Sequence, residues 1–359
     1  MEQKKAYILL LNWNGWKDTV ECVNSILNNT YSNYQIVIVD NDSQDNSVEK
    51  IKNWIDQDLK ELVDYIEYNR EQIETGIYEK GNGAKDGNQI VIIQSKRNYG
   101  FADGNNLGLQ YILGQGDAEY VWLLNNDTVI EKDSLTYMVS FAESNASVGL
   151  VGAKLLYYDE PNRIQTLGGG NNVTWKNAGE WIKNNELENE SNDQDFELTG
   201  YVCGASIFVK KNVIEDIGLL DPNFFMWVEE VEWCIRASKL GHKMAYCSKA
   251  KVWHKEGAST SKNHEKSFLG RKSKRLSLSR FVVTNYYGIR NQTYLVNKHF
   301  ARYKTNYLLY TFFVIIKRIM GIIVFDDHKK IRIYLLFKAL YDGLTNNMGK
   351  TVDPKNIIN

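Results

Sequence analysis

The 359-residue sequence has few cysteines and lacks the two common glycine-rich nucleotide-binding motifs. Its four cysteines, Cys22, Cys203, Cys234 and Cys247, are far apart and form no CxxC pair, which argues against a disulfide framework or a thiolate zinc site. They are expected to be core residues in a reducing compartment. The sequence contains neither a GxxxxGK[ST] loop nor a GxGxxG fingerprint, so it predicts neither a P-loop nucleotidase nor a dinucleotide-binding domain.

Long uninterrupted apolar runs are also missing. The amino-terminal run in MEQKKAYILLLNWNG is short and meets Asn12 and Asn14 at once, so it predicts a first strand rather than a signal peptide, and hence a cytoplasmic protein. A second apolar segment, residues 307–325, is interrupted by Lys317 and Arg318, whereas a membrane-spanning helix needs about 20 consecutive apolar residues. This segment is therefore not expected to cross a bilayer.

Charge is distributed unevenly along the chain. The net charge is −1, but residues 262–338 contain 17 Lys or Arg and 3 Asp or Glu, a balance of +14, so the remaining residues sum to −15. A basic region attracts anionic membranes or nucleic acids. Residues 307–325 predict an amphipathic helix, which favours the membrane, with an apolar stripe of Leu308, Phe312, Ile315, Ile316, Ile319, Ile322 and Ile323. Two interpretations stay open, because the stripe suits both a lipid surface and packing against the rest of the protein.

The first half of the sequence alternates between strand-like and helix-like patterns. AYILLLNW, YQIVIVDN, QIVIIQ and EYVWLL are near-continuous apolar runs, and amphipathic segments such as DTVECVNSILNN and NSVEKIKNWI separate them. Such a pattern predicts an α/β protein with a mostly parallel sheet flanked by helices. Residues 56–88 are charged and end in KGNGAKDGN, which indicates a surface insertion with a mobile loop. The acidic residues 186–195 are expected to form a flexible loop.

Polar residues directly follow three of the predicted strands. Ligands of open parallel sheets bind outside the carboxyl ends of the strands, so these residues are candidates for a binding site. They are Asn12 and Asn14 after the first strand, Asp40 and Asp42 after the second, and Asn125, Asn126 and Asp127 after EYVWLL. A fourth element, NYGFADGNNLG at residues 98–108, places Gly100, Gly104 and Gly108 where the backbone can approach a ligand. Without an anion cradle, a protein that handles a diphosphate needs a divalent cation, for which Asp127 is a suitable ligand.

Four separated motifs resemble family 2 inverting glycosyltransferases with the GT-A fold, in particular the bacterial rhamnosyltransferase-like branch. They are VDNDSQDNS, NYGFADGNNLG, LLNNDT, and GLLDPNFFMWVEEVEWCIRASKLG followed by VWHKEGAS. The resemblance implies a Rossmann-like GT-A catalytic domain over residues 1–260, with a nucleotide-sugar half at about 1–130 and an acceptor half at about 131–260. Residues 261–359 then form a basic, amphipathic helical C-terminal extension.

The resemblance also implies roles for individual residues. Asp127 in LLNNDT is implied to bind a divalent metal, Mg²⁺ or Mn²⁺, and His254 in VWHKEGAS to complete the metal site. Asn125 replaces the first acidic residue of the family's DxD motif. From the residues alone, a helix cap at Asp127 and a partly buried structural histidine at position 254 are the alternatives. The expected nucleotide-sugar pocket comprises Asn12, Asn14, Asp40, Asp42, Asn98, Gly104, Asn105, Asn125 and Asn126.

An inverting transfer needs one general base, because the acceptor hydroxyl must lose its proton as it attacks. The candidates are Glu229, Glu230 and Glu232 in WVEEVEWC; on a helix, the first two point about 100 degrees apart, so only one of them can face a cleft. The family's Glu-Asp motif implies Glu230, here a Glu in place of Asp, with Glu229 in reserve. Trp227 is a candidate for stacking on an acceptor sugar, and Arg236 is expected to pair with Glu232.

The sequence therefore predicts an inverting, metal-dependent glycosyltransferase of surface polysaccharide synthesis, held at the inner face of the cell membrane by its basic C-terminal region. The best match is transfer of L-rhamnose from dTDP-rhamnose to a glycan or a polyprenyl-diphosphate-linked saccharide. One alternative is a UDP-hexose or UDP-N-acetylhexosamine transferase of the same fold. The alternative of another class, a non-catalytic nucleic-acid-binding protein, explains the basic region but leaves the carboxylates after the strands without a role.

Overall fold

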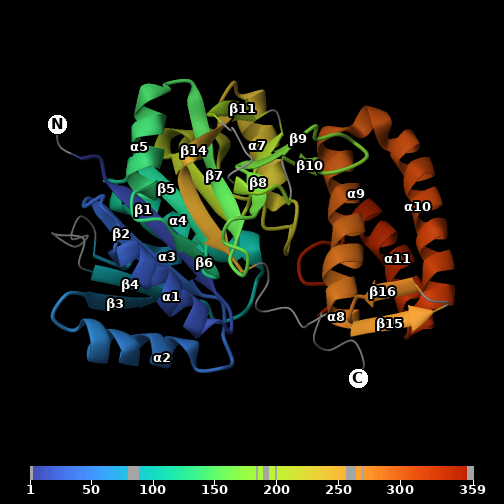
Figure 1. Cartoon of the computed structure of the whole chain (residues 1–359), viewed down its shortest axis with the longest axis horizontal. Helices are drawn as coiled ribbons and strands as arrows, with labels where there is room; N and C mark the ends of the chain where they lie inside the picture. Colours follow the sequence, from blue (N-terminus) through green and yellow to red (C-terminus); the bar gives the residue numbers. More distant parts are fainter. Residues whose placement is uncertain are drawn as a thin grey trace. The chain divides into compact units, whose positions relative to one another are not determined.

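A computed structural model describes residues 3–79, 89–182, 185–188, 194–198, 200–255, 264–268 and 271–353 of the protein. The chain forms two compact units (Figure 1). Unit 1 comprises Met1–Val173, Gly179–Asp221 and Glu230–Ala258, and unit 2 comprises Thr174–Ala178, Pro222–Glu229 and Ser259–Asn359. Two short segments from the middle of the sequence therefore belong to the same compact unit as the C-terminal region.

Unit 1 is built on an 11-stranded sheet with the order β11-β14-β7-β13-β5-β1-β2-β4-β3, in which β6 also pairs with β14 and β8 with β7. Its central strands are parallel: β1 (Ala6–Asn12), β2 (Tyr34–Asp40), β4 (Gln89–Gln94) and β5 (Tyr120–Asn125). Helices cover both faces of these strands, and their sequences are accordingly continuous apolar runs. The predicted mostly parallel α/β sheet is confirmed.

The remaining strands extend this sheet on both sides. On one side, β3 (Asp64–Asn69) runs parallel to β4. On the other, β13 (Ser206–Lys210) lies antiparallel between β5 and β7 (Val148–Tyr157), and β14 (Lys243–His254) runs parallel to β7 and antiparallel to β6 (Thr128–Ile130) and β11 (Phe196–Leu198). The strand β8 (Ile164–Leu167) is antiparallel to β7. A separate small sheet contains β9 (Gly169–Asn171), β10 (Glu180–Trp181) and β12 (Tyr201–Val202).

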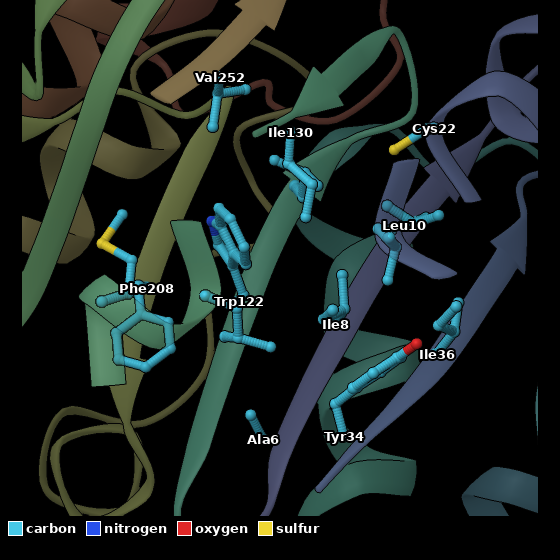
Figure 2. Packing of buried hydrophobic residues seen from close by; sticks show 14 of the residues in the cluster. Ala6, Ile8, Leu10, Cys22, Tyr34, Ile36, Trp122, Ile130, Phe208 and Val252 are labelled. Carbon is cyan, nitrogen blue, oxygen red and sulfur yellow. The ribbon is translucent and has the colours of Figure 1, made fainter. Parts of the chain in front are cut away.

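The helices that flank the sheet are α1 (Trp16–Leu27), α2 (Ser47–Trp54, continued by a π turn at Ile55–Leu59), α3 (Arg70–Thr75), α4 (Phe101–Gln115), α5 (Ser134–Ser144), α6 (Lys211–Ile217) and α7 (Glu229–Lys239). The core between helices and sheet is apolar; Figure 2 shows Ile8, Leu10, Trp122 and Phe208 among its residues. All four cysteines are free and buried, as expected. Burial also raises the pKa of the Cys22 thiol to about 12, so this thiol stays protonated at neutral pH.

Residues 56–88 were expected to be a surface insertion with a mobile loop, but their first part belongs to the sheet and its flanking helices. The segment contains β3, which forms an edge of the large sheet, and α3, which begins with a capping box between Asn69 and Gln72. An edge strand tolerates charged side chains that a central strand would exclude, so β3 does not show the apolar run of the other strands. The glycine-rich stretch at 80–88 lies outside the described residues.

The described parts of the acidic segment 186–195 are held by the sheet. Glu188 pairs with Lys154 of β7 at 3.3 Å and with Lys251 of β14 at 2.6 Å. Asp195 accepts hydrogen bonds from the backbone N and the hydroxyl of Ser248 at 2.7 and 2.8 Å. The flexible loop expected here is therefore wrong for both ends of the segment; residues 189–193 lie outside the described part of the chain.

Two glycines of α4 allow the helix to pack closely on the sheet. A Cβ atom on Gly104 would lie 2.6 Å from Leu11 Cδ1, and one on Gly108 would lie even closer to Leu9 Cδ1. Both positions therefore exclude a side chain because β1 occupies the space. The two glycines thus let α4 pack closely on the leucine side chains of β1, and the approach of the backbone to a ligand at Gly104 stays a prediction.

Unit 2 contains a hairpin of β15 (His264–Phe268) and β16 (Arg271–Arg275) and the helices α8 (Leu278–Phe281), α9 (Gly288–His299), α10 (Lys304–Phe325) and α11 (Lys329–Leu344). A π turn at Val282–Tyr287 connects α8 to α9, and a 3-10 turn at Ala301–Tyr303 precedes α10. The unit has a core of its own, which includes Phe225, Tyr286, Tyr287, Ile315 and Leu336. The expected helical C-terminal region is thus present.

The packed face of α10 differs from the predicted stripe. The residues of α10 that are buried are Tyr307, Thr311, Ile315 and Ile322, whereas Phe312, Ile316 and Ile323 of the predicted stripe are exposed. In the described part of the chain, residues 301–325 form the one helix that is long and apolar enough to cross a membrane, and little of it is buried. Because α10 is apolar on nearly every side, its hydrophobicity does not select the face that packs. A polar contact helps to orient the packed face of α10, since the hydroxyls of Tyr307 on α10 and Thr293 on α9 lie 2.9 Å apart.

Candidate active site

The two predicted metal ligands lie side by side in unit 1. Thr128 of β6 is paired with His254 of β14, which places Asp127, the residue before β6, next to the histidine. Nε2 of His254 lies 3.3 Å from Oδ1 of Asp127, and both side chains are largely buried, at 12% and 14% exposure. The backbone N of Lys255 donates to the carbonyl of Asp127 at 3.0 Å, which fixes the same turn from the other side.

A buried glutamine orients this histidine. Oε1 of Gln165, on β8, lies 2.9 Å from Nδ1 of His254, and Gln165 is fully buried. The contact between Nδ1 and the amide oxygen fixes the imidazole ring with Nε2 directed toward the carboxylate of Asp127. Sequence reasoning missed Gln165; the one signal was a polar residue inside the buried strand IQTL.

A carboxylate oxygen and an imidazole nitrogen are both ligands of divalent cations. Adjacent ligands of an octahedral Mg²⁺ ion lie about 3 Å apart, close to the observed separation of Nε2 and Oδ1. No cluster of three or more His, Cys, Asp and Glu side chains suited to a metal occurs among the residues that the structure describes. A divalent ion at this pair would be held by Asp127 and His254 and would supply positive charge near the strand ends.

Lys255, directly after β14, forms ion pairs with two carboxylates of α1. Its ammonium lies 2.6 Å from Oδ1 of Asp18 and 2.5 Å from Oε2 of Glu21, and the hydroxyl of Tyr158 donates to Glu21 at 2.6 Å. Burial disfavours the charge of Lys255, but the hydrogen bonds that its ammonium donates to Asp18 and Glu21 outweigh this effect and raise the pKa of the ammonium. The lysine thus stays charged and paired, and it stabilises the position of the neighbouring His254.

The strand ends of β1, β2 and β5 are joined by a buried polar network. Asn12, which is fully buried, donates from Nδ2 to Asp40 at 2.6 Å and to Ser43 at 3.1 Å. Its Oδ1 accepts from Thr19 at 2.9 Å and from Asn126 at 3.3 Å. Both polar atoms of Asn12 are therefore engaged within the protein. This arrangement supports a role of Asn12 and Asn126 in shaping the rim of the sheet.

Asp40 fixes the loop that follows β2. It accepts hydrogen bonds from the backbone N and the hydroxyl of Ser43 at 2.9 and 2.7 Å, and burial raises the pKa of its carboxyl group despite these bonds. Asn14 joins the same loop, since its backbone N donates to Ser43 at 2.8 Å and its Oδ1 accepts from Gln44 N at 2.7 Å. Asp42, with a positive φ of 65°, is partly exposed. Ser43, which sequence reasoning had not selected, thus joins three of the predicted residues, Asn12, Asn14 and Asp40.

The next loop is tied to β2 through Asn41, which lies between the predicted residues Asp40 and Asp42. Asn41 is 2% exposed and donates to Oδ1 of Asn98 at 3.2 Å and to the carbonyl of Gly100 at 3.0 Å. Asn98 itself is partly exposed at this loop. Asn105 lies one turn inside α4, is 2% exposed and donates to Phe101 O at 2.9 Å. Asn125, at the end of β5, is partly exposed and its backbone N donates to Ala205 O at 3.0 Å.

The three glutamates of α7 differ in exposure. Glu229 and Glu232 are 4% and 0% exposed, whereas Glu230 is partly exposed. Its carboxyl group faces Gly204, where an added Cβ atom would lie 3.6 Å from Glu230 Cδ. The expected pair of Glu232 with Arg236 is confirmed at 2.9 Å, and Arg236 also donates to Leu219 O at 2.7 Å, so this arginine braces the helix. Of the three, Glu230 is the one whose side chain is accessible from outside.

The sequence predicts core positions for three tryptophans, Trp13, Trp122 and Trp233. Trp122 and Trp233 are fully buried, but Trp13 is only partly buried because it lies in the loop after β1. Trp227 is 51% exposed. A large aromatic face exposed two residues before α7 is available for stacking on a sugar ring.

The fold and the polar rim of the sheet together define a GT-A type protein. The structure superposes on a crystal structure of GalNAc-T7 with UDP, GalNAc and Mn²⁺ with a TM-score of 0.51 and 14% identity, over 81% of this chain and 51% of that chain. The chain belongs to the glycosyltransferase-like family 2, whose model matches residues 5–269.

Two relatives of known sequence share part of the chain. The low-salt glycan biosynthesis hexosyltransferase Agl10 of Haloferax volcanii is 25% identical over 169 residues, which cover 46% of this chain and 52% of that protein. The uncharacterized protein y4gI of Sinorhizobium fredii is 25% identical over 257 residues, which cover 68% of this chain and 23% of that protein. The chain thus spans about half the length of the first relative and less than a quarter of the second.

Proposed function

We propose that the protein is an inverting, metal-dependent glycosyltransferase. The observation that carries the proposal is the Asp127 and His254 pair, oriented by the buried Gln165. The pair lies on the sheet whose strand ends carry Asp40, and ligands of such sheets bind outside the carboxyl ends of the strands. Membership of the glycosyltransferase-like family 2 and the likeness to a hexosyltransferase support the same reaction class.

The residues of this chain would divide the reaction between them. Asp127 and His254 would hold a divalent ion, which supplies electrostatic stabilisation of the negative charge that develops on a departing nucleoside diphosphate. Glu230 would accept the proton of the acceptor hydroxyl as the hydroxyl attacks the anomeric carbon from the face opposite the leaving group. Trp227 would stack on the acceptor sugar. The nine residues of the expected nucleotide-sugar pocket would either bind the donor directly or hold the protein loops that form the pocket.

Within this class, the donor is best proposed as dTDP-L-rhamnose and the acceptor as a glycan or a polyprenyl-diphosphate-linked saccharide in surface polysaccharide synthesis. The motif resemblance supports this choice. A UDP-hexose or UDP-N-acetylhexosamine is the second candidate, which the hexosyltransferase relative and the structure solved with UDP and GalNAc favour. A few contacts to the sugar, each of modest energy, separate these donors.

A panel of UDP-, dTDP- and GDP-sugars tests the function. A donor present at about 100 times its Kd stabilises a folded protein by about 2.7 kcal/mol, so the correct nucleotide-sugar is expected to raise the Tm by several degrees. Mn²⁺ or Mg²⁺ should be required, and a chelator should remove the shift. Tight oligonucleotide binding without any metal-dependent shift would instead favour the nucleic-acid-binding alternative.

Unit 2 supports a peripheral location at the inner face of the cell membrane. The apolar face of α10 is defined here by its exposed residues Leu309, Phe312, Phe313, Ile316, Met320, Ile323 and Val324. It lies within the region of +14 charge, so an apolar surface and basic side chains occur together. This combination suits a bilayer with anionic lipids, where apolar burial and electrostatic attraction act in the same direction. A membrane surface would also give access to a polyprenyl-diphosphate-linked acceptor.

Exchange of Phe313 and Met320 for glutamate is expected to weaken binding to phosphatidylglycerol vesicles at least tenfold. Each large apolar side chain contributes about 1.5–3 kcal/mol when it is buried, and about 1.4 kcal/mol corresponds to a factor of ten. Co-sedimentation measures the binding. The control is Leu62→Glu, an exposed leucine of unit 1 at 65% exposure, which should bind like the wild type. Equal binding of all variants would contradict a role of the apolar face.

A further inference from the structure

Three aromatic rings gather at the amino-terminal end of α10 in unit 2. The ring of Trp175 stacks on that of Tyr303, with the centroids 5.9 Å apart and the planes inclined by 17°. The same tryptophan meets the edge of Tyr310, with the centroids 6.1 Å apart. Tyr310 is 41% exposed, and Trp175 and Tyr303 are partly exposed. Tyr303 comes directly before α10 and Tyr310 lies in its second turn, so the rings mark this end of the helix.

Two basic side chains lie over these rings. Nζ of Lys176 is 5.3 Å from the centre of the Trp175 ring and 6.0 Å from that of Tyr310. The guanidinium carbon of Arg302 is 4.7 Å from the centre of the Tyr303 ring. Lys176 and Arg302 are both exposed, so each cation is attracted to a ring while its charge stays accessible from outside. The three rings and the two cations are called the aromatic–basic cluster below.

The segment Thr174–Ala178, which supplies two members of the cluster, is held within unit 2 by a side chain of α9. Nε2 of Gln292 donates to Thr174 O at 3.3 Å and to Trp175 O at 3.4 Å, and Gln292 is 8% exposed. The backbone N of Lys176 donates to Thr174 Oγ1 at 3.2 Å, which fixes the turn inside the segment. The cluster is therefore formed entirely by residues of unit 2.

The cluster borders the apolar face of α10. Residues three positions apart share a side of a helix, so Tyr310 lies beside Phe313 of that face. Tryptophan and tyrosine are enriched where lipid headgroups meet the acyl chains, because their rings are apolar and carry a polar atom. Basic side chains at the same depth meet the lipid phosphates. An aromatic and basic rim beside an apolar face is thus the arrangement that a membrane surface requires.

Charge favours a bilayer over a second copy of the chain as the occupant of this surface. Residues 262–338 have a balance of +14, so two copies that meet through this face bring like charges together. Anionic lipids are attracted by the same residues. Lys176 adds a further positive charge at the cluster itself.

We propose that the aromatic–basic cluster anchors unit 2 at the headgroup level of an anionic bilayer. Trp175, Tyr303 and Tyr310 lie among the headgroups, Lys176 and Arg302 bind lipid phosphates, and the apolar face of α10 lies deeper. The inference rests on the proposed membrane location and adds the depth of one identified site to it. The amino-terminal end of α10 is then the end that is fixed at the headgroups.

Quenching of fluorescence by spin-labelled lipids tests the depth of Trp175 in the full chain. Vesicles of phosphatidylcholine and phosphatidylglycerol carry the nitroxide either on the headgroup or near the end of an acyl chain. The sequence has nine tryptophans, so the signal of Trp175 is the difference between the wild type and Trp175→Phe, which keeps an aromatic ring. We expect the headgroup label to quench this signal roughly twofold more strongly than the chain label.

The control for quenching is Trp16→Phe. Trp16 belongs to unit 1 and also has two lysines near its ring, with Nζ of Lys17 at 5.6 Å and Nζ of Lys50 at 5.3 Å. Its difference signal should be the same with both labels, because a cation near a tryptophan is not by itself a membrane anchor.

Charge reversal tests the contact with lipid phosphate. The double variant Lys176→Glu and Arg302→Glu is expected to bind phosphatidylglycerol vesicles about tenfold more weakly and pure phosphatidylcholine vesicles as the wild type does, because only the anionic headgroup repels it. Co-sedimentation measures both. The control, Lys60→Glu with Lys132→Glu, makes the same change of net charge at two exposed lysines of unit 1 and should bind like the wild type.

The outcomes separate this inference from the membrane location. If the wild type binds no vesicle, the location fails and the anchor fails with it. If the wild type binds, but the chain label quenches Trp175 at least as strongly as the headgroup label or the two double variants bind equally, only the anchor is overturned. A wild-type dimer in sedimentation equilibrium that Trp175→Ala converts to a monomer would assign the cluster to a second copy instead.

Discussion

Replacement of Asp127 by alanine is expected to abolish the metal-dependent binding of the nucleotide-sugar. Asp127 is one of two side chains in the proposed metal site, and the remaining His254 lacks the negative charge that attracts a hard cation. The divalent ion would then be held by one protein ligand and the diphosphate alone. We expect the affinity for Mn²⁺ in the presence of nucleoside diphosphate to fall at least a hundredfold, with transfer activity falling below detection. Electron paramagnetic resonance of free Mn²⁺ measures the first quantity directly.

Two further variants make this experiment specific. Asp127→Asn keeps the size of the side chain and removes its charge, so it should lose Mn²⁺ affinity nearly as completely as the alanine variant. Asp58→Ala changes an exposed aspartate on the π turn after α2 and should behave like the wild type. An Asp127→Ala protein that still shows a metal-dependent rise in Tm with the donor would disprove the proposed metal site.

Glu230→Gln is expected to retain donor binding and to lose transfer. Glutamine has nearly the same shape but cannot accept the proton of the acceptor hydroxyl, and a general base contributes about 10²–10⁴-fold to the rate. Initial rates of sugar transfer measure the loss, and the Tm shift with donor and metal confirms an intact donor site. Because Glu230 is partly exposed beside Gly204, the substitution should leave the fold unchanged.

The matched control is Glu229→Gln. Glu229 is 4% exposed and begins α7, so its loss should affect stability more than chemistry and reduce transfer by a smaller factor. Comparison of kcat at saturating donor separates the two variants, since a missing base lowers kcat without a change in KM for the donor. An exchange of the two phenotypes would move the base to Glu229.

Much of the sheet could be predicted because a strand buried on both faces has a continuous apolar sequence. YVWLLN and YQIVIVD are apolar throughout because they lie in the middle of a sheet with both faces covered. The same reasoning failed for β3, whose charged residues are compatible with a sheet edge, and for α10, where apolar residues on nearly every side left the packed face undetermined. The local sequence pattern thus located the strands that are buried on both faces. It missed the edge strand β3 and the packed face of α10, because these elements lie partly against protein and partly against solvent.

The candidate site was predicted in part. The resemblance implied Asp127 and His254, and strand pairing does bring them together. Gln165 and Ser43 were not selected, because their importance lies in a partner far away in sequence; Gln165 and His254, for example, are 89 positions apart. A polar residue in an apolar stretch was the sole sign, and many such residues are merely satisfied hydrogen-bonding groups.

By itself the sequence determined the α/β class, the parallel central strands, the buried free cysteines and the order of the motifs, because burial, helix periodicity and residue chemistry act over a few neighbouring positions. Only the tertiary structure decided which distant side chains meet: His254 with Asp127 and Gln165, and Trp175 with Tyr303 and Tyr310. Those contacts depend on strand pairing and helix packing between distant segments, and no local pattern specifies the distance between two side chains that the chain brings together only when it folds.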